Sequence, residues 1–217
     1  MKSYILFDMD GTLTDPAQGI TACAAYALRS QGIEEQDIQR LKRFIGPPLL
    51  EGFQELYGLS LLQAEQAVEQ FRKKYAQIGI ENNIPYPGIA EMLQELRSSG
   101  LSLAVATSKP QPFAQEILHR LQLEQYFCCI GGATLDNTRT KKGQVIAHVL
   151  EQLGISPQQA LMVGDRRHDA EGAREYGMDC VGVLYGYGSR QELEQAQVCA
   201  LAEDTSALGR LLHELCS

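Results

Sequence analysis

The sequence lacks the features of two specialised classes of protein, helical membrane proteins and nucleic-acid-binding proteins. No apolar stretch approaches the roughly 18–20 residues that a membrane-spanning helix requires, which excludes a helical membrane protein. Basic residues are outnumbered, with 19 Lys and Arg against 27 Asp and Glu, so the formal net charge is -8. Because the basic residues also do not cluster, nucleic acid is not an expected partner.

Cysteine usage points to a reducing compartment. The six cysteines show no CxxC spacing and are too sparse for a disulfide scaffold. Cys128 and Cys129 lie in an apolar run and are expected to be buried thiols. The chain runs directly into an apolar segment at residues 4–7, which leaves no room for a signal peptide. We therefore expect a cytoplasmic protein with no membrane partner, as a monomer or a homodimer.

What is present is the composition of an ordinary globular protein. The chain has 217 residues, of which 44% are hydrophobic and 21% are charged. This balance excludes wholesale disorder, collagen and coiled coil. The length accommodates one large domain, or one domain with a small insertion.

Residues 16–82 are expected to be entirely helical. Asp15 and Pro16 form a helix start, with Asp15 as the N-cap. Ser60 and Gln63 form a capping box for a later helix. The expected helices span residues 16–32, 33–45, 49–57 and 61–78, with a Gly-Pro-Pro break at 46–48.

Strands and helices alternate in the remainder of the chain. This order predicts an α/β fold, a doubly wound parallel sheet covered by helices on both faces. The predicted core comprises residues 1–15 and 83–217, and the helical segment 16–82 is inserted after the first strand. The expected strands are 2–8, 101–106, 127–130, 161–163 and 180–184. The expected helices are 89–99, 112–121, 143–153, 170–176 and 206–215, with a further one starting at a Ser189–Glu192 capping box.

Polar residues follow three of the expected strands. Ligands of open α/β sheets bind at the carboxyl ends of the strands, so these side chains should meet at one rim. Carboxylates this close repel one another unless a cation lies among them, and oxygen ligands without Cys or spaced His suit Mg²⁺ rather than Zn²⁺. Hydroxyl groups and a lysine can bind phosphate oxygens. The residues concerned are Asp8, Asp10, Thr107, Ser108, Lys109, Asp165 and Asp169, with Lys141 and Lys142 opening a nearby helix.

This pattern resembles the phosphatase branch of the haloacid dehalogenase superfamily. The four motifs occur in order: DxDGT at residues 8–12, Thr107-Ser108 after a strand, the lysine Lys142, and GDxxxD at residues 164–169. The helical insertion corresponds to the family's mobile cap. Residues 44–49 and 182–188 look like those of phosphoglycolate phosphatase-like and bacterial 5′-nucleotidase-like members.

The resemblance implies a Mg²⁺-dependent phosphatase acting on a small-molecule phosphate ester. Asp8 would be the nucleophile that takes the phosphoryl group. Asp10 would be the general acid and then the general base. The implied Mg²⁺ ligands are Asp8, the main-chain carbonyl of Asp10, and Asp165, with Asp169 orienting the metal waters or Lys142. The phosphate-binding residues would be Asp8, Thr107, Ser108 and Lys142.

Several assignments stay open in the sequence. The resemblance favours Lys142 over Lys141, because Lys142 lies three residues before Val145-Ile146, the spacing usual in the family. Arg43 and Phe44, next to the Gly-Pro-Pro break, are candidates for substrate specificity within the cap. The loop 185–188 is either a flexible turn or part of the site rim.

Other functions remain in competition with a monoesterase. A pyrophosphatase or a phosphomutase would use the same residues. A non-catalytic relative that binds a phosphorylated ligand would be expected to have at least one damaged motif, and none is damaged here.

Overall fold

The computed structural model describes residues 2–216, which form two compact units. Unit 1 contains the residues up to Asp15 and those from Pro85 onward, and unit 2 is Pro16–Ile84. Two short strands, β2 (Thr14–Asp15) and β3 (Ile84–Pro85), form a separate two-stranded sheet. Within residues 2–216, no helix combines the length and apolar character needed to cross a bilayer.

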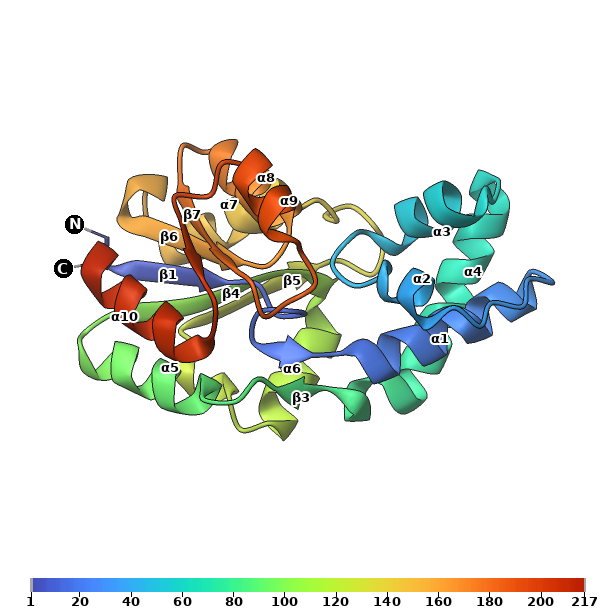
Figure 1. The fold of residues 1–217 in the computed structure, drawn as a ribbon, viewed down its shortest axis with the longest axis horizontal. Coiled ribbons are helices and arrows are strands. Elements are labelled where there is room, and N and C mark those ends of the chain that lie inside the picture. Colours follow the sequence, from blue (N-terminus) through green and yellow to red (C-terminus); the bar gives the residue numbers. More distant parts are fainter. Residues whose placement is uncertain (1, 217) are drawn as a thin grey trace. The chain divides into compact units, whose positions relative to one another are not determined.

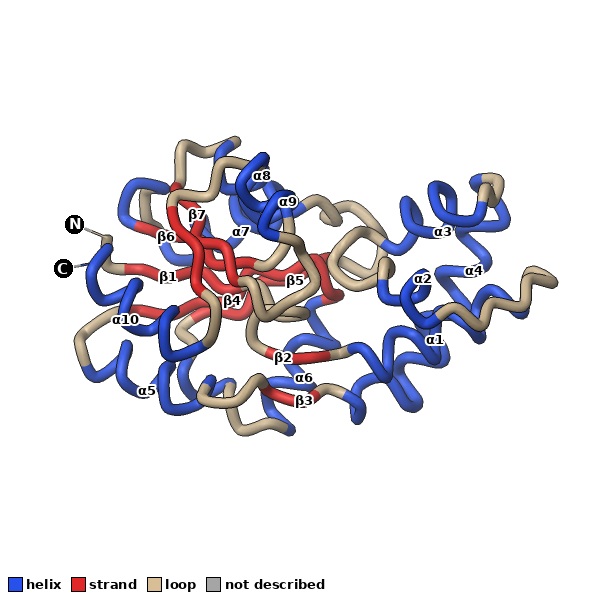
Figure 2. The backbone as a smooth tube through the Cα atoms, viewed as in Figure 1, coloured by secondary structure: helices blue, strands red, loops and turns tan. Residues whose placement is uncertain are grey.

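Unit 1 is built on a six-stranded parallel sheet, which confirms the predicted α/β class (Figure 2). The strand order is β5-β4-β1-β6-β7-β8, so the chain moves outward from β1 in one direction and returns to continue from β6 in the other. The strands are β1 (Tyr4–Phe7), β4 (Ser102–Pro110), β5 (Cys129–Ala133), β6 (Ala160–Gly164), β7 (Asp179–Val183) and β8 (Ala200–Ala202).

Helices cover both faces of this sheet (Figure 1). Helices α7 and α8 pack on one face, and α5, α6 and α10 lie on the other. The helices of unit 1 are α5 (Ile89–Ser98), α6 (Gln111–Arg120), α7 (Lys142–Leu153), α8 (Arg167–Arg174), α9 (Arg190–Gln195) and α10 (Thr205–Cys216), with 3₁₀ turns at Glu124–Tyr126 and Pro157–Gln159.

The central strands are continuous apolar runs because helices cover them on both sides. Leu6, Ala104 and Met162 from three neighbouring strands lie in one fully buried cluster with residues of α7 and α8. Strand β8 was not predicted. It has only three residues and lies at the edge of the sheet, so it carries no alternating pattern that the sequence could show.

Unit 2 is helical, with helices α1 (Ala17–Ser30), α2 (Ile38–Lys42), α3 (Leu49–Tyr57) and α4 (Leu61–Lys74). A π-helical turn follows at Tyr75–Gly79 and a 3₁₀ turn at Ile80–Asn82. The capping box of Ser60 and Gln63 is present at the start of α4, as predicted.

Three local predictions in and around unit 2 were wrong. The helix predicted over 33–45 is shorter, because the Asp37 side chain accepts a hydrogen bond from Gln39 N and starts α2 at that point. Asp15 is not the N-cap of α1. That position belongs to Pro16, and the Asp15 carboxylate accepts a hydrogen bond from the Tyr187 hydroxyl. The last predicted helix ends at Lys74, where the backbone changes to the π-helical turn.

Two predictions in unit 1 need correction. Cys128 is exposed and Cys129 is half-buried, because Cys128 precedes and Cys129 begins β5, which is an edge strand of the sheet. At the start of α9, Ser189 accepts the expected hydrogen bond from Glu192 N. The Glu192 carboxylate, however, binds the Arg166 guanidinium at 2.9 Å, which draws it toward α8.

Candidate active site

Asp8 and Asp165 lie side by side because they directly follow two paired strands. In the register of the sheet, Phe7 pairs with Val163 of β6, and Asp8 N donates to Val163 O at 2.8 Å. Both carboxylates are buried at the carboxyl edge of the sheet. β1 and β6 are the neighbouring strands from which the chain continues toward opposite edges of the sheet. Open α/β sheets bind ligands at such a point.

Lys142 joins this pair from the first residue of α7. Its ammonium Nζ lies 2.6 Å from Asp8 Oδ1, 2.8 Å from Asp169 Oδ1 and 2.9 Å from the carbonyl oxygen of Ala106. Burial lowers the pKa of Lys142, but Asp169 and Asp8 outweigh that effect and raise it above its usual value. Lys141 is exposed, so geometry places Lys142, not its neighbour, in the cluster.

Helices α7 and α8 come close enough for this contact because small residues separate them. A Cβ atom on Gly172 of α8 would lie 2.8 Å from Gly143 N and 2.9 Å from Lys142 Cγ. The two helices therefore approach at a distance that only glycine permits. This approach brings Lys142 to Asp169, which stands in the first turn of α8.

Asp8, Asp165 and Asp169 form a cluster that could hold a metal ion. One carboxylate oxygen from each lies within 4.8 Å of the others, and all three residues are buried. Burial, together with the charge of Asp8, raises the pKa of Asp169 to about 6, although Lys142 works against the rise. Burial first, and then Asp169 and Asp8, raise the pKa of Asp165 well above its usual value.

The environment of Asp165 fits a cation. Its Oδ2 accepts a hydrogen bond from Tyr187 N at 2.7 Å, but its buried Oδ1 has no hydrogen-bond partner within residues 2–216. Buried oxygens are normally paired, and a cation would supply the missing interaction. Four buried carboxylates against two buried lysines leave a net charge of -2 when all are ionised, which one divalent cation would neutralise; the residues are Asp8, Asp10, Asp165, Asp169, Lys109 and Lys142.

The segments around Asp165 are glycine-rich because they pass so close to it. Gly11 has φ +89°, and a Cβ there would lie 2.2 Å from Asp165 Oδ2. A Cβ on Gly188 would lie 1.8 Å from the Asp165 carbonyl oxygen. The tight turn after β1 and the loop after β7 therefore both close directly on this carboxylate.

Asp10 has a lysine partner that sequence reasoning missed. Lys109 Nζ lies 2.9 Å from Asp10 Oδ2, and the two side chains are only 4% and 11% exposed. Burial raises the pKa of Asp10 against the lowering effect of Lys109. The signal was available, because Lys109 follows Thr107 and Ser108 near the end of β4, but the position of a lysine at a strand end does not reveal its partner.

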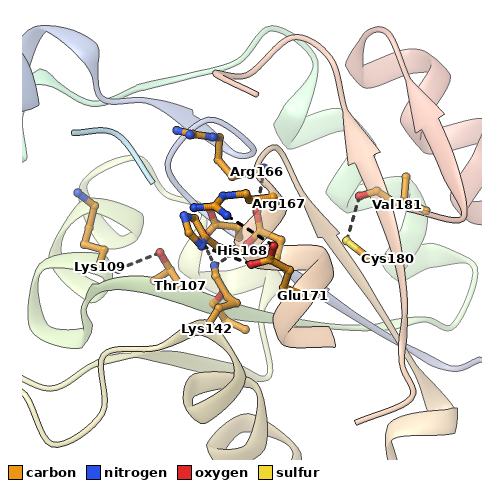
Figure 3. Close-up of polar contacts among 12 residues, drawn as sticks. Thr107, Lys109, Lys142, Arg166, Arg167, His168, Glu171, Cys180 and Val181 are labelled. Atoms are coloured by element: carbon orange, nitrogen blue, oxygen red, sulfur yellow. Dashed lines mark hydrogen bonds and ion pairs between the residues drawn. The ribbon is translucent and has the colours of Figure 1, made fainter. Parts of the chain in front are cut away.

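The two predicted hydroxyl residues stand at the same strand end. Thr107 is buried, and its Oγ1 accepts a hydrogen bond from Lys109 N at 3.2 Å, drawn in Figure 3. Ser108 is half-buried. Thr107 Oγ1 keeps its own proton to donate, and both residues lie where the strand ends of β1 and β4 meet.

The loop 185–188 is tied to the site rather than being a free turn. The Tyr185 hydroxyl donates to Thr12 O at 3.0 Å, and the Tyr185 ring packs edge-on against Tyr86 with centroids 4.9 Å apart. Tyr187 binds Asp165 through its main chain and Asp15 through its hydroxyl. The loop therefore connects the predicted metal ligand Asp165 with the segments that flank unit 2 in the sequence.

Two side chains from the first turn of α8, Arg167 and His168, approach Glu171 of the same helix. Arg167 Nη1 lies 3.8 Å and His168 Nδ1 lies 3.9 Å from the Glu171 carboxylate, and all three residues are labelled in Figure 3. Burial, followed by the neighbouring arginines, lowers the pKa of His168. Arg167 and His168 therefore both pair with Glu171 of their own helix.

The two residues predicted in the cap belong to unit 2. The Phe44 ring is buried there, 4.7 Å from the Phe53 ring centroid and stacked on Tyr57 at 5.9 Å. It therefore has a packing role in unit 2. Arg43 is exposed, and its assignment to specificity stays a prediction.

Comparison with known proteins shows that the chain is similar to enzymes named as phosphatases and nucleotidases. Residues 5–183 match the family described as haloacid dehalogenase-like hydrolase. The chain is 44% identical over 209 residues to a 5′-nucleotidase of Pseudomonas aeruginosa, covering 96% of this chain and 95% of that protein. A phosphoglycolate phosphatase of Pseudomonas putida is 30% identical over 220 residues, with 96% and 79% covered.

The chain is also similar to a protein named as a kinase and to a solved structure of a predicted phosphatase. The tyrosine-protein kinase PtkA of Mycobacterium tuberculosis is 41% identical over 184 residues, with 85% of this chain and 62% of that protein covered. The crystal structure of a predicted phosphatase from Clostridium acetobutylicum superposes with a TM-score of 0.96 at 37% identity, covering 99% of both chains.

Proposed function

Because the chain belongs to the haloacid dehalogenase-like hydrolase family, we propose that it is a Mg²⁺-dependent phosphatase of small-molecule phosphate monoesters that forms an aspartyl phosphate on Asp8. The observation that carries this proposal is the buried cluster in which Lys142 contacts Asp8 and Asp169, with Asp165 alongside. Unit 2 would be the cap of the catalytic unit.

In the first step, a carboxylate oxygen of Asp8 attacks phosphorus and the ester P–O bond breaks. Asp10 gives its proton to the departing oxygen, so that an alcohol leaves rather than an alkoxide. The Lys142 ammonium, beside Asp8, offsets negative charge on the transferring oxygens, and Thr107 and Ser108 would hold those oxygens through their hydroxyl groups.

In the second step, water attacks the phosphorus of the aspartyl phosphate. Asp10, now ionised, takes a proton from that water, and the bond between Asp8 and phosphorus breaks to release inorganic phosphate. Asp8, Asp165 and the main-chain carbonyl of Asp10 would hold Mg²⁺. When bound, the ion supplies positive charge to the phosphoryl group. Asp169 keeps Lys142 directed at Asp8.

The test is a panel of phosphate esters assayed with and without Mg²⁺. Phosphoglycolate and nucleoside monophosphates are the leading candidates, since they are the substrates of relatives named phosphoglycolate phosphatase and 5′-nucleotidase. Release of phosphate that depends on Mg²⁺ and is blocked by EDTA supports the proposal. Faster release of phosphate from pyrophosphate than from the esters would indicate a pyrophosphatase. Transfer of the phosphoryl group to an added sugar phosphate would indicate a phosphomutase. No turnover of any compound would favour a non-catalytic relative.

Metal binding can be tested without turnover. Mg²⁺ at about 100 times its dissociation constant should stabilise the folded protein by about 2.7 kcal/mol, which a thermal melt detects. Asp165→Asn should remove that stabilisation. The same variant should melt at a higher temperature than wild type in EDTA, because it relieves the repulsion among three buried carboxylates. An unchanged Mg²⁺ response in Asp165→Asn would rule Asp165 out as a ligand.

A second prediction concerns the loop that closes on Asp165. Gly188→Ala places a Cβ where the Asp165 carbonyl oxygen lies, so the loop must move and the Tyr187 N–H shifts away from the carboxylate. We expect a destabilisation of about 1–3 kcal/mol and a higher Mg²⁺ concentration for half-maximal activity. Gly209→Ala is the control, because its Cβ would meet only a flexible Met92 side chain at 3.3 Å. Equal Mg²⁺ requirements in the two variants would contradict the prediction.

A further inference from the structure

The Lys109–Asp10 ion pair has no role in the reaction as described so far. Lys109 Nζ lies 2.9 Å from Asp10 Oδ2, and both side chains are nearly inaccessible to solvent. Burying an ammonium group costs several kcal/mol of hydration free energy. A lysine retained at such a depth therefore depends on its carboxylate partner.

The second oxygen of the same carboxylate is unpaired. Asp10 Oδ1 is buried and has no hydrogen-bond partner within residues 2–216. One oxygen is thus bound to a lysine, while the other is left to bond with a group that enters the site. The two oxygens of Asp10 are consequently not equivalent.

We propose that Lys109 is a positioning residue for the phosphatase reaction: it holds Asp10 Oδ2, so that Oδ1 exchanges the proton with the leaving oxygen and then with water. This inference rests on the proposed function, because it assigns Lys109 a part in the same reaction. Lys109 acts only through Asp10 in this assignment.

The backbone of β4 explains how Lys109 reaches Asp10. The pairing of β4 with β5 shifts register between Thr107 and Pro110. Irregularities of this kind turn a side chain away from the direction that the strand would give it. The segment is fixed in place by the hydrogen bond from Lys109 N to Thr107 Oγ1, and it packs on Gly132, where a Cβ would lie 2.7 Å from Lys109 O.

The two buried lysines divide the reacting carboxylates between them. Lys142 contacts Asp8, the proposed nucleophile, and Lys109 contacts Asp10, the proposed acid and base. Both are labelled in Figure 3, where Lys142 comes from a helix and Lys109 from the strand end of β4. Loss of Lys109 should accordingly impair proton transfer rather than nucleophilic attack.

This difference can be measured through the leaving group. Alkyl phosphates need a proton on the departing oxygen, whereas 2,4-dinitrophenyl phosphate does not. We expect Lys109→Met to lower kcat/KM for an alkyl phosphate by about 100-fold and for the dinitrophenyl ester by less than about 3-fold. Because kcat/KM reports on the first chemical step, the later need for a base does not obscure the comparison.

Three companion variants keep the test decisive. Lys109→Arg, which retains the charge, should recover part of the alkyl activity. In an Asp10→Asn background, Lys109→Met should cost little more, because its effect passes through Asp10. Lys73→Met, at an exposed lysine, should match wild type. Hydrolysis of the dinitrophenyl ester by Lys109→Met at a rate within about 3-fold of wild type would show that the variant is folded.

The inference would be overturned if Lys109→Met lowered kcat/KM equally for both esters. It would also be overturned if Lys109→Met caused its full loss of kcat/KM in the Asp10→Asn background. In either case the phosphatase function would stand. If wild type with Mg²⁺ hydrolyses neither ester nor any compound of the panel, the proposed function fails and this inference fails with it. If Lys109→Met does not fold, Lys109→Arg decides, since a selective loss on the alkyl ester supports the inference and an equal loss overturns it.

Discussion

Asp8→Asn is expected to lower kcat by about four orders of magnitude or more, because an amide oxygen cannot replace the carboxylate that attacks phosphorus. The reaction then has no route through an aspartyl phosphate. Steady-state hydrolysis of the best ester in the panel measures the loss. A trapping experiment that detects phosphorylated protein in wild type and none in Asp8→Asn measures the same step directly.

The change at Asp8 is small in volume, so the fold should persist. Circular dichroism and a thermal melt establish this, and Mg²⁺ should bind to the variant weakly or not at all. Asp37→Asn is the matched control, because Asp37 is exposed and Asn serves equally well as a helix N-cap. Substantial hydrolysis by folded Asp8→Asn would contradict the assignment of the nucleophile.

Lys142→Ala should reduce kcat by about 100–1,000-fold, since it removes the cation next to the transferring phosphoryl group. Lys141→Ala should change kcat by less than about 3-fold, because Lys141 is exposed. Both lysines lie at the start of α7, but only Lys142 is buried and contacts Asp8, so the comparison tests the position of the charge. Equal losses, or a larger loss at Lys141, would transfer the role to that residue.

Removal of Lys142 also affects stability. It leaves Asp8 and Asp169 buried without their shared cation, and breaking a buried ion pair costs about 3–5 kcal/mol. Lys142→Met preserves more of the side-chain volume and separates loss of charge from loss of packing. Kinetics should therefore be measured below the melting temperature of each variant.

Much of unit 1 could be predicted from local patterns. Buried parallel strands are short apolar runs, and such runs occur at residues 4–7 and 160–164 with helices between the strands. Because ligand-binding residues follow the strands directly, Asp8 and Asp165 could be paired before their contact was known. Lys142, by contrast, was favoured over Lys141 through the motif spacing of the family that the sequence resembles, not through a local pattern.

Other features depended on packing that no local pattern encodes. Phe44 precedes a Gly-Pro-Pro break and suggested a projecting loop, yet its ring is enclosed by Phe53 and Tyr57. Cys128 lies in an apolar run and suggested burial, yet it precedes an edge strand and is exposed. In each case, the neighbours in space come from distant parts of the chain.

The sequence by itself therefore determined the α/β class and the set of polar residues at the strand ends, because both follow from periodicity and from the direction of parallel strands. Only the tertiary structure decided which of these residues touch. The approach of α7 and α8 at Gly172 brings Lys142 to Asp169, and the register shift in β4 brings Lys109 to Asp10. Contacts between charged groups depend on distances of a few ångströms, and only the packing of the whole unit fixes such distances.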